Sequence, residues 1–363
     1  MRSGRMAKSP GKLTIRDIAD RAETSPATVS RVLSNSPYPV RPELRQRILQ
    51  AAAAAEYAPN AIGRMLRQGF SRDIGVIVPT ISNPFYAQLL LGVELEARQA
   101  DFNILICNSF RDPRIEKSAI ENLIRKQAAG ILISGLGDNQ GLLEKIQRQG
   151  TAIVAFDQNI DSQVCNQVGF NFIRGGMLAA EYLAGLGHRR IAFLTTPLNR
   201  RSRREMLEGF RRELLRHDLE LPDECLLVAG QEEESATIYE LAAGRELAGR
   251  FLALPQRPTA LAVVNDLLAM GILQQLHEAG LQIPRDVSVI GFDDLPFAAL
   301  TTPALTTIRQ PALEMGRLAF RIVRGQISQT SNPAQYRPPP VTTLLEPELI
   351  VRQTAAPPEP ARL

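Results

Sequence analysis

The sequence predicts an α/β protein in which a small all-α head precedes a body of two doubly wound lobes. Apolar residues recur at helical intervals between Thr14 and Glu56, whereas short β-rich runs alternate with helical stretches from Ile74 onward. Most of these runs begin about 22 to 30 residues apart, which is the spacing of βαβ units in parallel sheets. The 363 residues, 44% of them hydrophobic and 22% charged, suffice for two or three domains and exclude collagen, coiled-coil rods and disordered chains.

The head is predicted to contain a helix-turn-helix. Thr14 and Asp17 have the spacing of a capping box, which starts a first helix. Ser25-Pro26 starts a second helix, with a hydroxyl at the N-cap and proline at the first helical position. Two short helices joined by three or four residues form the motif whose second helix enters the major groove of DNA. A third helix is expected from about Pro42 to Glu56, and its inward-facing residues are predicted to be Leu44, Ile48, Leu49 and Ala52.

The solvent face of the second helix has the chemistry to contact DNA. It carries Ala27, Thr28, Ser30 and Arg31. Hydroxyls suit phosphate oxygens, and an arginine can bind O6 and N7 of guanine together. Residues 1–70 hold twelve Lys and Arg but only five Asp and Glu, so the head is expected to bind a polyanion. The residues alone leave open a plain three-helix domain with an incidentally exposed Arg31.

Segments of the head and body resemble the LacI/GalR family of transcriptional regulators. In the head these segments begin at Thr14, Ser25 and Tyr57. Further blocks follow in the family's order at Ile74–Pro79, Asn83–Tyr86, Leu186–Ile191, Asn265-Asp266, Gly291–Asp294 and Glu346–Arg352. The resemblance implies a helix-turn-helix head and a periplasmic-binding-protein-like body with an effector between its lobes. Glu23 replaces the usual turn glycine and Arg41 the usual Ser or Thr cap of the third helix, and both are expected to lower the stability of the head slightly.

By this resemblance, Pro59–Leu66 is a hinge helix that forms when a dimer sits on its operator. Eight residues are too few for a stable isolated helix, and Gly63 costs a further ~1 kcal/mol relative to alanine. Leu66 matches the family's wedge, an apolar side chain that enters a base step in the minor groove. The alternative is an ordinary linker. The candidate DNA-contacting residues are Thr14, Ser25, Pro26, Ala27, Thr28, Ser30, Arg31, Ser34, Asn60, Gly63 and Leu66.

The effector is expected beyond the carboxyl ends of the strands, where open α/β sheets bind ligands. Amides and carboxylates that follow strand-like runs match family positions that contact polar effector groups, and an aromatic ring can stack on the apolar face of a polyol. The candidate effector-binding residues are Phe85, Tyr86, Asp157, Arg203, Arg204, Asn265 and Asp293.

Several of these positions have plainer alternatives. Phe85 could belong to the core of a lobe, and the arginine loop at residues 200–204 could be solvated surface. Asp266 is interpreted as the cap of a helix that starts at Leu267. Met206 stands where many relatives carry an arginine that grips the effector, so Arg203 or Arg204 is a possible substitute. Glu232 stands where relatives often place an aromatic, and the identity of the effector therefore does not transfer.

The domain boundaries follow from these patterns. A helix-turn-helix head at 1–58, with a basic arm at 1–12, precedes a hinge at 59–71 and an effector-binding body at 72–354. The first lobe is predicted at about 72–169 and 295–326, and the second at about 170–294 and 327–354. Residues 355–363 form a proline-rich tail without leucine heptads, so a homodimer is expected rather than a tetramer.

The resulting prediction is a transcriptional repressor, not an enzyme, that binds a pseudo-palindromic DNA operator under the control of a sugar-like metabolite. Known nucleotide-binding and hydrolase motifs are missing. The three cysteines form no CxxC pair, so no metal and no cofactor are expected. Without an apolar signal peptide or membrane run, we expect no membrane association and a cytoplasmic protein. The alternatives are a small-molecule binding protein that does not bind DNA, or an enzyme, on the same two-lobed fold.

Overall fold

The computed structural model describes residues 13–33, 38–55, 57, 71–135, 139–157, 164–230, 239–330 and 339–359. The chain divides into two compact units, Met1–Ser71 and Arg72–Leu363. We call them the head and the body and describe each by itself.

The head consists of three packed helices, which confirms the predicted helix-turn-helix and third helix. They are α1 (Ile15–Arg21), α2 (Pro26–Leu33) and α3 (Pro42–Ala54). Ile18, Val29 and Ile48, one from each helix, are fully buried at the centre of the head. The prediction for Leu49 was wrong, because this side chain is 46% exposed. Successive residues point about 100° apart around a helix, so the burial of Ile48 turns its neighbour outward.

The helix starts in the head follow from local side-chain chemistry. The Asp17 carboxylate accepts hydrogen bonds from the backbone N–H of Thr14 (2.6 Å) and from its hydroxyl (2.7 Å). These bonds, the hydroxyl bond first, lower the pKa of Asp17. The Ser25 hydroxyl accepts from the backbone N–H of Thr28 at 3.2 Å, which caps α2. Between these helices Glu23 has φ +50°, the left-handed region that favours glycine.

The body contains two six-stranded sheets, so the prediction of two α/β lobes is confirmed. The sheet of the first lobe is entirely parallel. Its strand order is β11 (Thr342–Leu345), β5 (Asn166–Phe170), β4 (Ala152–Phe156), β3 (Gly130–Ile133), β1 (Asp73–Val78) and β2 (Asn103–Asn108). The sheet of the second lobe is parallel except for its last strand. Its order is β7 (Leu226–Val228), β6 (Ile191–Thr195), β8 (Ala260–Val263), β9 (Ser288–Asp293), β10 (Thr306–Arg309) and β12 (Glu348–Ile350).

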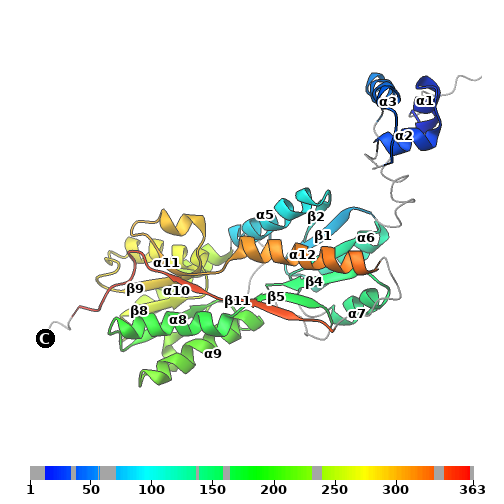
Figure 1. Ribbon diagram of the computed structural model, residues 1–363. Helices are drawn as coiled ribbons and strands as arrows, with labels where there is room; N and C mark the ends of the chain where they lie inside the picture. The colour runs from blue at the N-terminus through cyan, green and yellow to red at the C-terminus, as the bar shows by residue number, and fades with distance from the viewer. Residues whose placement is uncertain are drawn as a thin grey trace, which may run out of the picture. The chain divides into compact units, whose positions relative to one another are not determined.

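Helices cover both faces of each sheet (Figure 1). In the first lobe α6 (Pro113–Arg125) and α7 (Gln140–Arg148) cover one face, and α5 (Pro84–Gln99) packs beside α12 (Ala312–Thr330) on the other. In the second lobe α8 (Phe172–Gly185) pairs with α9 (Arg201–Arg216), and α10 (Tyr239–Leu252) pairs with α11 (Asp266–Glu278). Two short 3-10 helices, Asp223–Cys225 and Pro296–Ala299, complete the second lobe.

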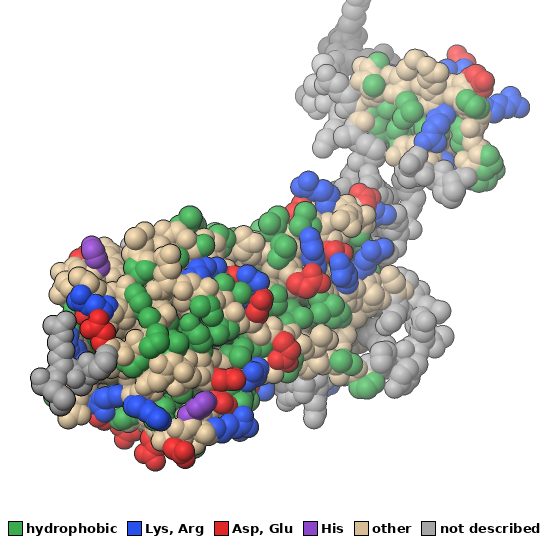
Figure 2. Space-filling view, turned by 60° about the vertical axis from the view of Figure 1, so that its left-hand side comes forward, with side chains coloured by type: hydrophobic (Ala, Val, Ile, Leu, Met, Phe, Trp, Pro, Cys, Tyr) green, Lys and Arg blue, Asp and Glu red, His purple; other side chains and the backbone are tan. Residues whose placement is uncertain are grey.

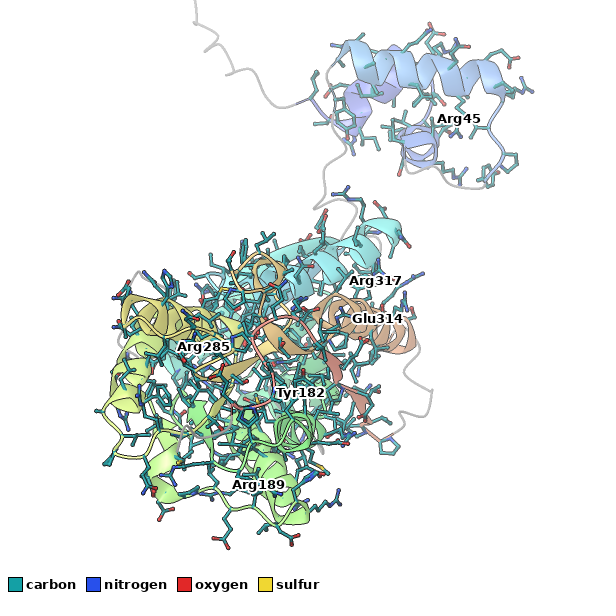
Figure 3. All side chains as sticks on the ribbon, turned by 90° about the vertical axis from the view of Figure 1, so that its left-hand side faces the viewer. Arg45, Tyr182, Arg189, Arg285, Glu314 and Arg317 are labelled. Carbon is teal, nitrogen blue, oxygen red and sulfur yellow. The ribbon has the colours of Figure 1, made fainter. Side chains whose placement is uncertain are left out.

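The surface of the body mixes charges of both signs with gathered hydrophobic side chains, as Figure 2 shows for one face. On α12, Glu314 and Arg317 lie one turn apart and form an ion pair of 3.8 Å (Figure 3). Arg321 of the same helix reaches Glu96 on α5 at 2.8 Å. Such exposed pairs contribute little to stability. The burial of apolar residues between helices and sheets therefore provides most of the stabilisation.

The chain crosses between the lobes at positions that correct two predicted boundaries. Strand β10 pairs with β9, so residues 295–310 belong to the second lobe and not to the first. Strand β11 pairs with β5, so the first lobe continues beyond residue 326 and through β11. Strands β5, β7, β10, β11 and β12 were not predicted. They are short or interrupted by polar residues, and they are recognisable only by the neighbour with which each one pairs.

Candidate DNA-reading helix and effector cleft

The outer side of α2 presents the side chains that were predicted to contact DNA. Ala27 and Arg31 are exposed, and Thr28 and Ser30 are half-buried. The hydroxyls of Ser25 and Thr28 lie 2.9 Å apart at the start of the helix. Backbone N–H groups and hydroxyls at a helix N-terminus are suitable donors to phosphate. This end of α2 therefore has the groups needed to hold a DNA backbone.

Arg31 lies over the ring of Tyr38, with its guanidinium carbon 4.1 Å from the ring centroid. An aromatic ring under a guanidinium restricts its position and leaves its edge available for hydrogen bonds. Tyr38 was not predicted from the sequence, because it lies seven positions after Arg31 and no periodic pattern connects the two residues. The predicted contacts Ser34, Asn60, Gly63 and Leu66 and the basic arm lie outside the described residues.

In the body, a cavity of about 30 Å³ lies between the two lobes. Residues from both lobes line it at the carboxyl ends of several strands, as expected for an open α/β sheet. Five of the predicted effector-binding residues are among them: Phe85, Tyr86, Asp157, Arg203 and Asp293. The other lining residues are Asn83, Arg111, Phe172, Arg200, Ser202, Glu240 and Gln310. The cavity is small because side chains of opposite lobes meet in it.

Tyr86 and Asp157 form the polar wall of the first lobe. The Tyr86 hydroxyl donates to Asp157 Oδ2 at 2.8 Å, and both side chains are buried. Burial and the nearby Asp157 carboxylate raise the pKa of Tyr86 well above its ordinary value. Asn83 accepts a hydrogen bond from the backbone N–H of Phe85 and so caps α5, which fixes both aromatic residues at the cavity. The rings of Phe85 and Tyr86 pack edge to face, so Phe85 combines lobe packing with a place in the lining.

Arg203, in the first turn of α9, is one of two arginines of residues 200–204 that line the cavity. It is 8% exposed, and it donates to Thr196 Oγ1 at 3.1 Å and to the carbonyl of Val264 at 3.3 Å. Met206 lies one turn further along α9 and is buried in the core of the second lobe. Arg204 does not line the cavity, because its guanidinium bonds to the carbonyls of residues 198 and 199.

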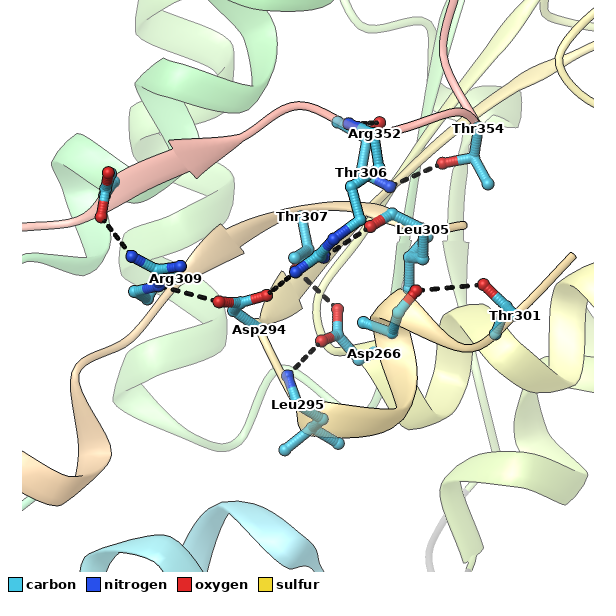
Figure 4. A network of polar contacts seen from close by, with 12 residues as sticks. Asp266, Asp294, Leu295, Thr301, Leu305, Thr306, Thr307, Arg309, Arg352 and Thr354 are labelled. Atoms are coloured by element: carbon cyan, nitrogen blue, oxygen red, sulfur yellow. Dashed lines mark hydrogen bonds and ion pairs between the residues drawn. The ribbon is translucent and has the colours of Figure 1, made fainter. Parts of the chain in front are cut away.

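Asn265 and Asp266 both differ from their predicted roles, and neither of them lines the cavity. The Asn265 side chain accepts from the backbone N–H of Leu268 at 2.7 Å, so Asn265 is the cap of α11 and does not line the cavity. Asp266 is the first residue of the helix, and its fully buried carboxylate accepts from the Thr307 hydroxyl (2.6 Å) and from the backbone N–H of Leu295 (2.8 Å) (Figure 4). Burial raises the pKa of Asp266 to about 7.

Asp294 belongs to the same polar network. It pairs with Arg309 at 2.8 Å and with Arg352 at 2.5 Å (Figure 4). Its neighbour Asp293 faces the cavity and accepts from Gln310 Nε2 at 2.7 Å. Burial, followed by the nearby Asp266, raises the pKa of Asp293 well above its ordinary value.

Known proteins share both parts of the chain. Residues 14–60 match the family described as bacterial regulatory proteins, lacI family, and residues 180–355 match a periplasmic binding protein-like domain. The ribose operon repressor of Escherichia coli strain K12 is 33% identical over 317 residues, which are 87% of this chain and 93% of that repressor. The chain belongs to the lacI family.

Other members of the lacI family are similar over nearly the whole chain. The HTH-type transcriptional repressor PurR of Mannheimia succiniciproducens is 30% identical over 344 residues, which are 94% of this chain and 98% of that protein. The lac repressor dimer, solved with operator and the anti-inducer ONPF, has a TM-score of 0.82 and 25% identity over 95% of this chain and all of that one. A LacI family regulator from Enterococcus faecium with bound ribose has a TM-score of 0.66 and 27% identity over 78% of this chain and 99% of that one. The chain is thus a DNA-binding transcriptional regulator and not an enzyme.

Seven cavity residues of this lacI family member were not among the predicted effector-binding residues: Asn83, Arg111, Phe172, Arg200, Ser202, Glu240 and Gln310. Arg200 and Ser202 lie in the same arginine-rich segment as the predicted Arg203, and Asn83 lies two residues before the predicted Phe85. None of the helices in the described ranges combines the length and apolar character needed to cross a membrane. Among those same residues, no three His, Cys, Asp or Glu side chains gather closely enough to hold a metal ion.

Proposed function

We propose that this lacI family member is a homodimeric repressor that reads a pseudo-palindromic operator with α2 and senses a small hydroxylated metabolite in the cavity between its lobes. The observation that carries the proposal is the cavity itself, because residues from both lobes line it. A ligand that contacts both lobes favours one separation of the lobes over another. Through that preference it changes the affinity of the protein for DNA. Because the operator lies in the bacterial cytoplasm, we propose that the protein acts there.

The dimer is supported by exposed apolar side chains of the first lobe. Strand β2 is an edge strand, and Ile106 on it is 50% exposed. Ile81, Leu91 and Phe110 are 57%, 46% and 65% exposed. Contiguous apolar surface is typical of a protein interface, and we propose that these four exposed side chains belong to one. A symmetric dimer would present two α2 helices to two half-sites.

The test of this function is operator selection from random duplex DNA, followed by gel shifts at two salt concentrations. We expect one enriched palindromic site, and an affinity that falls steeply as salt rises because phosphate contacts release counterions. Arg31→Ala is expected to relax the preference at one base pair of each half-site, and Ser25→Ala to weaken binding to all sequences more evenly. Failure to enrich any sequence over random competitor contradicts the proposed function.

The control by a metabolite needs a separate measurement. Sugars, sugar derivatives, nucleosides and purine bases are added to the protein–operator complex, and the fluorescence anisotropy of labelled DNA is followed. We expect one compound class to change the affinity for the operator at least about tenfold, which corresponds to about 1.4 kcal/mol of coupling. An operator affinity that no compound changes contradicts the regulatory part of the proposal.

A further inference from the structure

The first turn of α9 carries positive charge at a place where helix electrostatics disfavours it. The helix begins at Arg201 with Arg200 as its N-cap, Arg203 follows, and the first turn holds no acidic residue. The N-terminus of a helix bears partial positive charge, so acidic groups stabilise it and arginines do not. Helix α6 of the same chain follows the rule, with Asp112 as its cap and Glu116 in its first turn. Departures of this kind are expected at functional sites.

Three guanidinium groups converge on the cavity at this helix start. Arg111 comes from the first lobe, and Arg200 and Arg203 come from the second. The hydrogen bonds of Arg203, to Thr196 Oγ1 and to the carbonyl of Val264, both go to uncharged oxygens. Burial, followed by the nearby charges of Arg111 and Arg203, lowers the pKa of Arg200 to about 10, and burial also lowers the pKa of Arg203.

Two arginines nearer the surface show the opposite direction. Hydrogen bonds to Glu224 and Glu278 raise the pKa values of Arg190 and Arg245. At Arg200 and Arg203 burial is the largest cause and lowers the pKa, so water solvates the charges of these guanidinium groups poorly. An anion bound beside them would stabilise their charged forms.

The carboxyl groups of the cavity already have partners within the protein. Glu240 is paired with Arg111 at 3.0 Å, Asp157 accepts from Tyr86, and Asp293 accepts from Gln310. Burial, the largest cause, raises the pKa of the Asp293 carboxyl. Gln310 binds Asp293 through its amide nitrogen, and its amide oxygen, Oε1, has no hydrogen-bond partner among the described residues. This oxygen is buried, and the Gln310 residue is only 6% exposed. A ligand hydroxyl is a suitable donor to this oxygen.

We propose that the effector is an anionic sugar derivative, whose carboxylate or phosphate binds among Arg111, Arg200 and Arg203 at the start of α9. Its hydroxyl groups face Asp157 and Gln310, and Phe85 and Phe172 supply the apolar walls. This inference rests on the proposed function, because it specifies the ligand of the same cavity. It separates this chain from a sensor of neutral sugars.

The test is titration calorimetry of the full chain with two matched trios. One is D-ribose, D-ribonate and D-ribose 5-phosphate, and the other is D-glucose, D-gluconate and D-glucose 6-phosphate. We expect an anionic member to bind at least about tenfold more tightly than its neutral parent, since hydrogen bonds to charged groups are the stronger ones. Comparison of the sugar acids, D-ribonate and D-gluconate, with the two sugar phosphates shows whether a carboxylate or a phosphate binds more tightly. Neutral parents that bind as tightly as their anions, or no binding by any of the four anions, overturn the proposal.

Variants of α9 separate a charge effect from a structural one. Arg203→Met is expected to lower the affinity for the anion at least about tenfold. It should change the affinity for the neutral parent sugar less than about threefold. Arg203→Lys retains a positive charge and should restore part of the loss. Arg211→Met, an exposed site on the same helix, is the matched control and should leave both affinities unchanged. Equal losses for the anion and the neutral parent contradict the proposal. Arg200→Gln repeats the comparison if Arg203→Met does not fold.

Operator binding without ligand distinguishes failure of this inference from failure of the proposed function. If the chain selects an operator but prefers neutral sugars, only the anionic ligand is excluded. If it binds anions in the cavity but selects no operator, the proposed function fails and the ligand class stands.

Discussion

Arg111 and Glu240 lie 129 residues apart in the chain and form an ion pair of 3.0 Å that joins the two lobes of the body. The Arg111 side chain is 15% exposed and that of Glu240 is 5% exposed. Arg111 follows β2 in the first lobe, and Glu240 lies in the first turn of α10 in the second. The pair therefore joins the two lobes at the cavity, which both of its residues line.

Removal of the Glu240 charge should open the cavity. In Glu240→Gln, Arg111 would stay buried opposite an uncharged amide, and an uncompensated buried charge costs about 3–5 kcal/mol. Separation of the lobes lets water reach the guanidinium and avoids most of that cost. We expect a larger radius of gyration for the ligand-free full chain in small-angle scattering. Glu278→Gln, which breaks the exposed pair with Arg245 within one lobe, is the control and should leave the radius unchanged. A radius that is the same in both variants would show that the pair does not hold the lobes together.

The stability of the body should fall as the pH rises from about 4 to about 7. Burial raises the pKa of Asp266 to about 7, whereas the unfolded chain has the ordinary value of 3.8. In this interval the folded state binds the extra proton and the unfolded state does not, so each pH unit removes up to about 1.4 kcal/mol. Above about pH 7 both states are ionised and the slope ends. Urea unfolding followed by circular dichroism between pH 4 and 8 measures the slope.

The variant Asp266→Asn tests the origin of that slope. An amide at this position still accepts from Leu295 and can donate to Thr307, but it does not titrate. We expect a flatter profile, with the remainder due to Asp293, whose pKa burial also raises. Asp286→Asn at an exposed site, where hydrogen bonds lower the pKa, should leave the slope between pH 5 and 7 intact. An unaltered slope in Asp266→Asn would place the titration elsewhere.

Two glycines on α10 should respond in opposite ways to alanine. A Cβ at Gly244 would lie against the carbonyl oxygen of Leu268 on α11, well inside van der Waals contact, and one at Gly271 would meet Leu241 in the same way. Gly244→Ala should force these helices apart and cost about 1–3 kcal/mol of unfolding free energy. Gly249 lies about one and a half turns further along α10 and faces open space. Gly249→Ala should therefore raise the free energy of unfolding by about 0.5–1 kcal/mol. Thermal unfolding of both variants gives the comparison, and a similar change in both would refute the close approach.

Replacement of Glu23 by glycine should stabilise the head. Glu23 has φ +50°, and a left-handed conformation costs a non-glycine residue about 1–2 kcal/mol. Its ion pair with Arg47 spans 3.8 Å between largely exposed side chains and offsets little of that cost. Glu23→Gly should therefore slow amide hydrogen exchange in α1–α3 of the full chain about fivefold or more, which corresponds to about 1 kcal/mol. Glu23→Gln keeps the strain and removes the charge, so it should not slow exchange.

The residues that the sequence located correctly are those whose signal is local. Thr14, Asp17, Ser25 and Pro26 mark helix starts by caps that depend on atoms three residues away. The buried strands of both lobes follow from continuous apolar runs, and Asp157 and Asp293 were selected because they stand at the carboxyl ends of such strands. By contrast, the prediction that Asp266 caps α11 was wrong and Asn265 is the cap, because two adjacent polar residues at a helix start have the same sequence signal and differ only in which neighbours surround them.

The sequence by itself determined the family, the three-helix head, the two parallel-sheet lobes and the strand ends at which a ligand would bind, because periodicity and capping act over a few residues. Only the tertiary structure decided which arginines face the cavity, that Glu240 reaches across to Arg111, and that β10 and β11 belong to the lobes opposite to those expected. These relationships join residues up to 175 positions apart, such as Asn171 and Glu346. Long-range contacts depend on how separate elements pack, and no periodic pattern in the sequence predicts that packing.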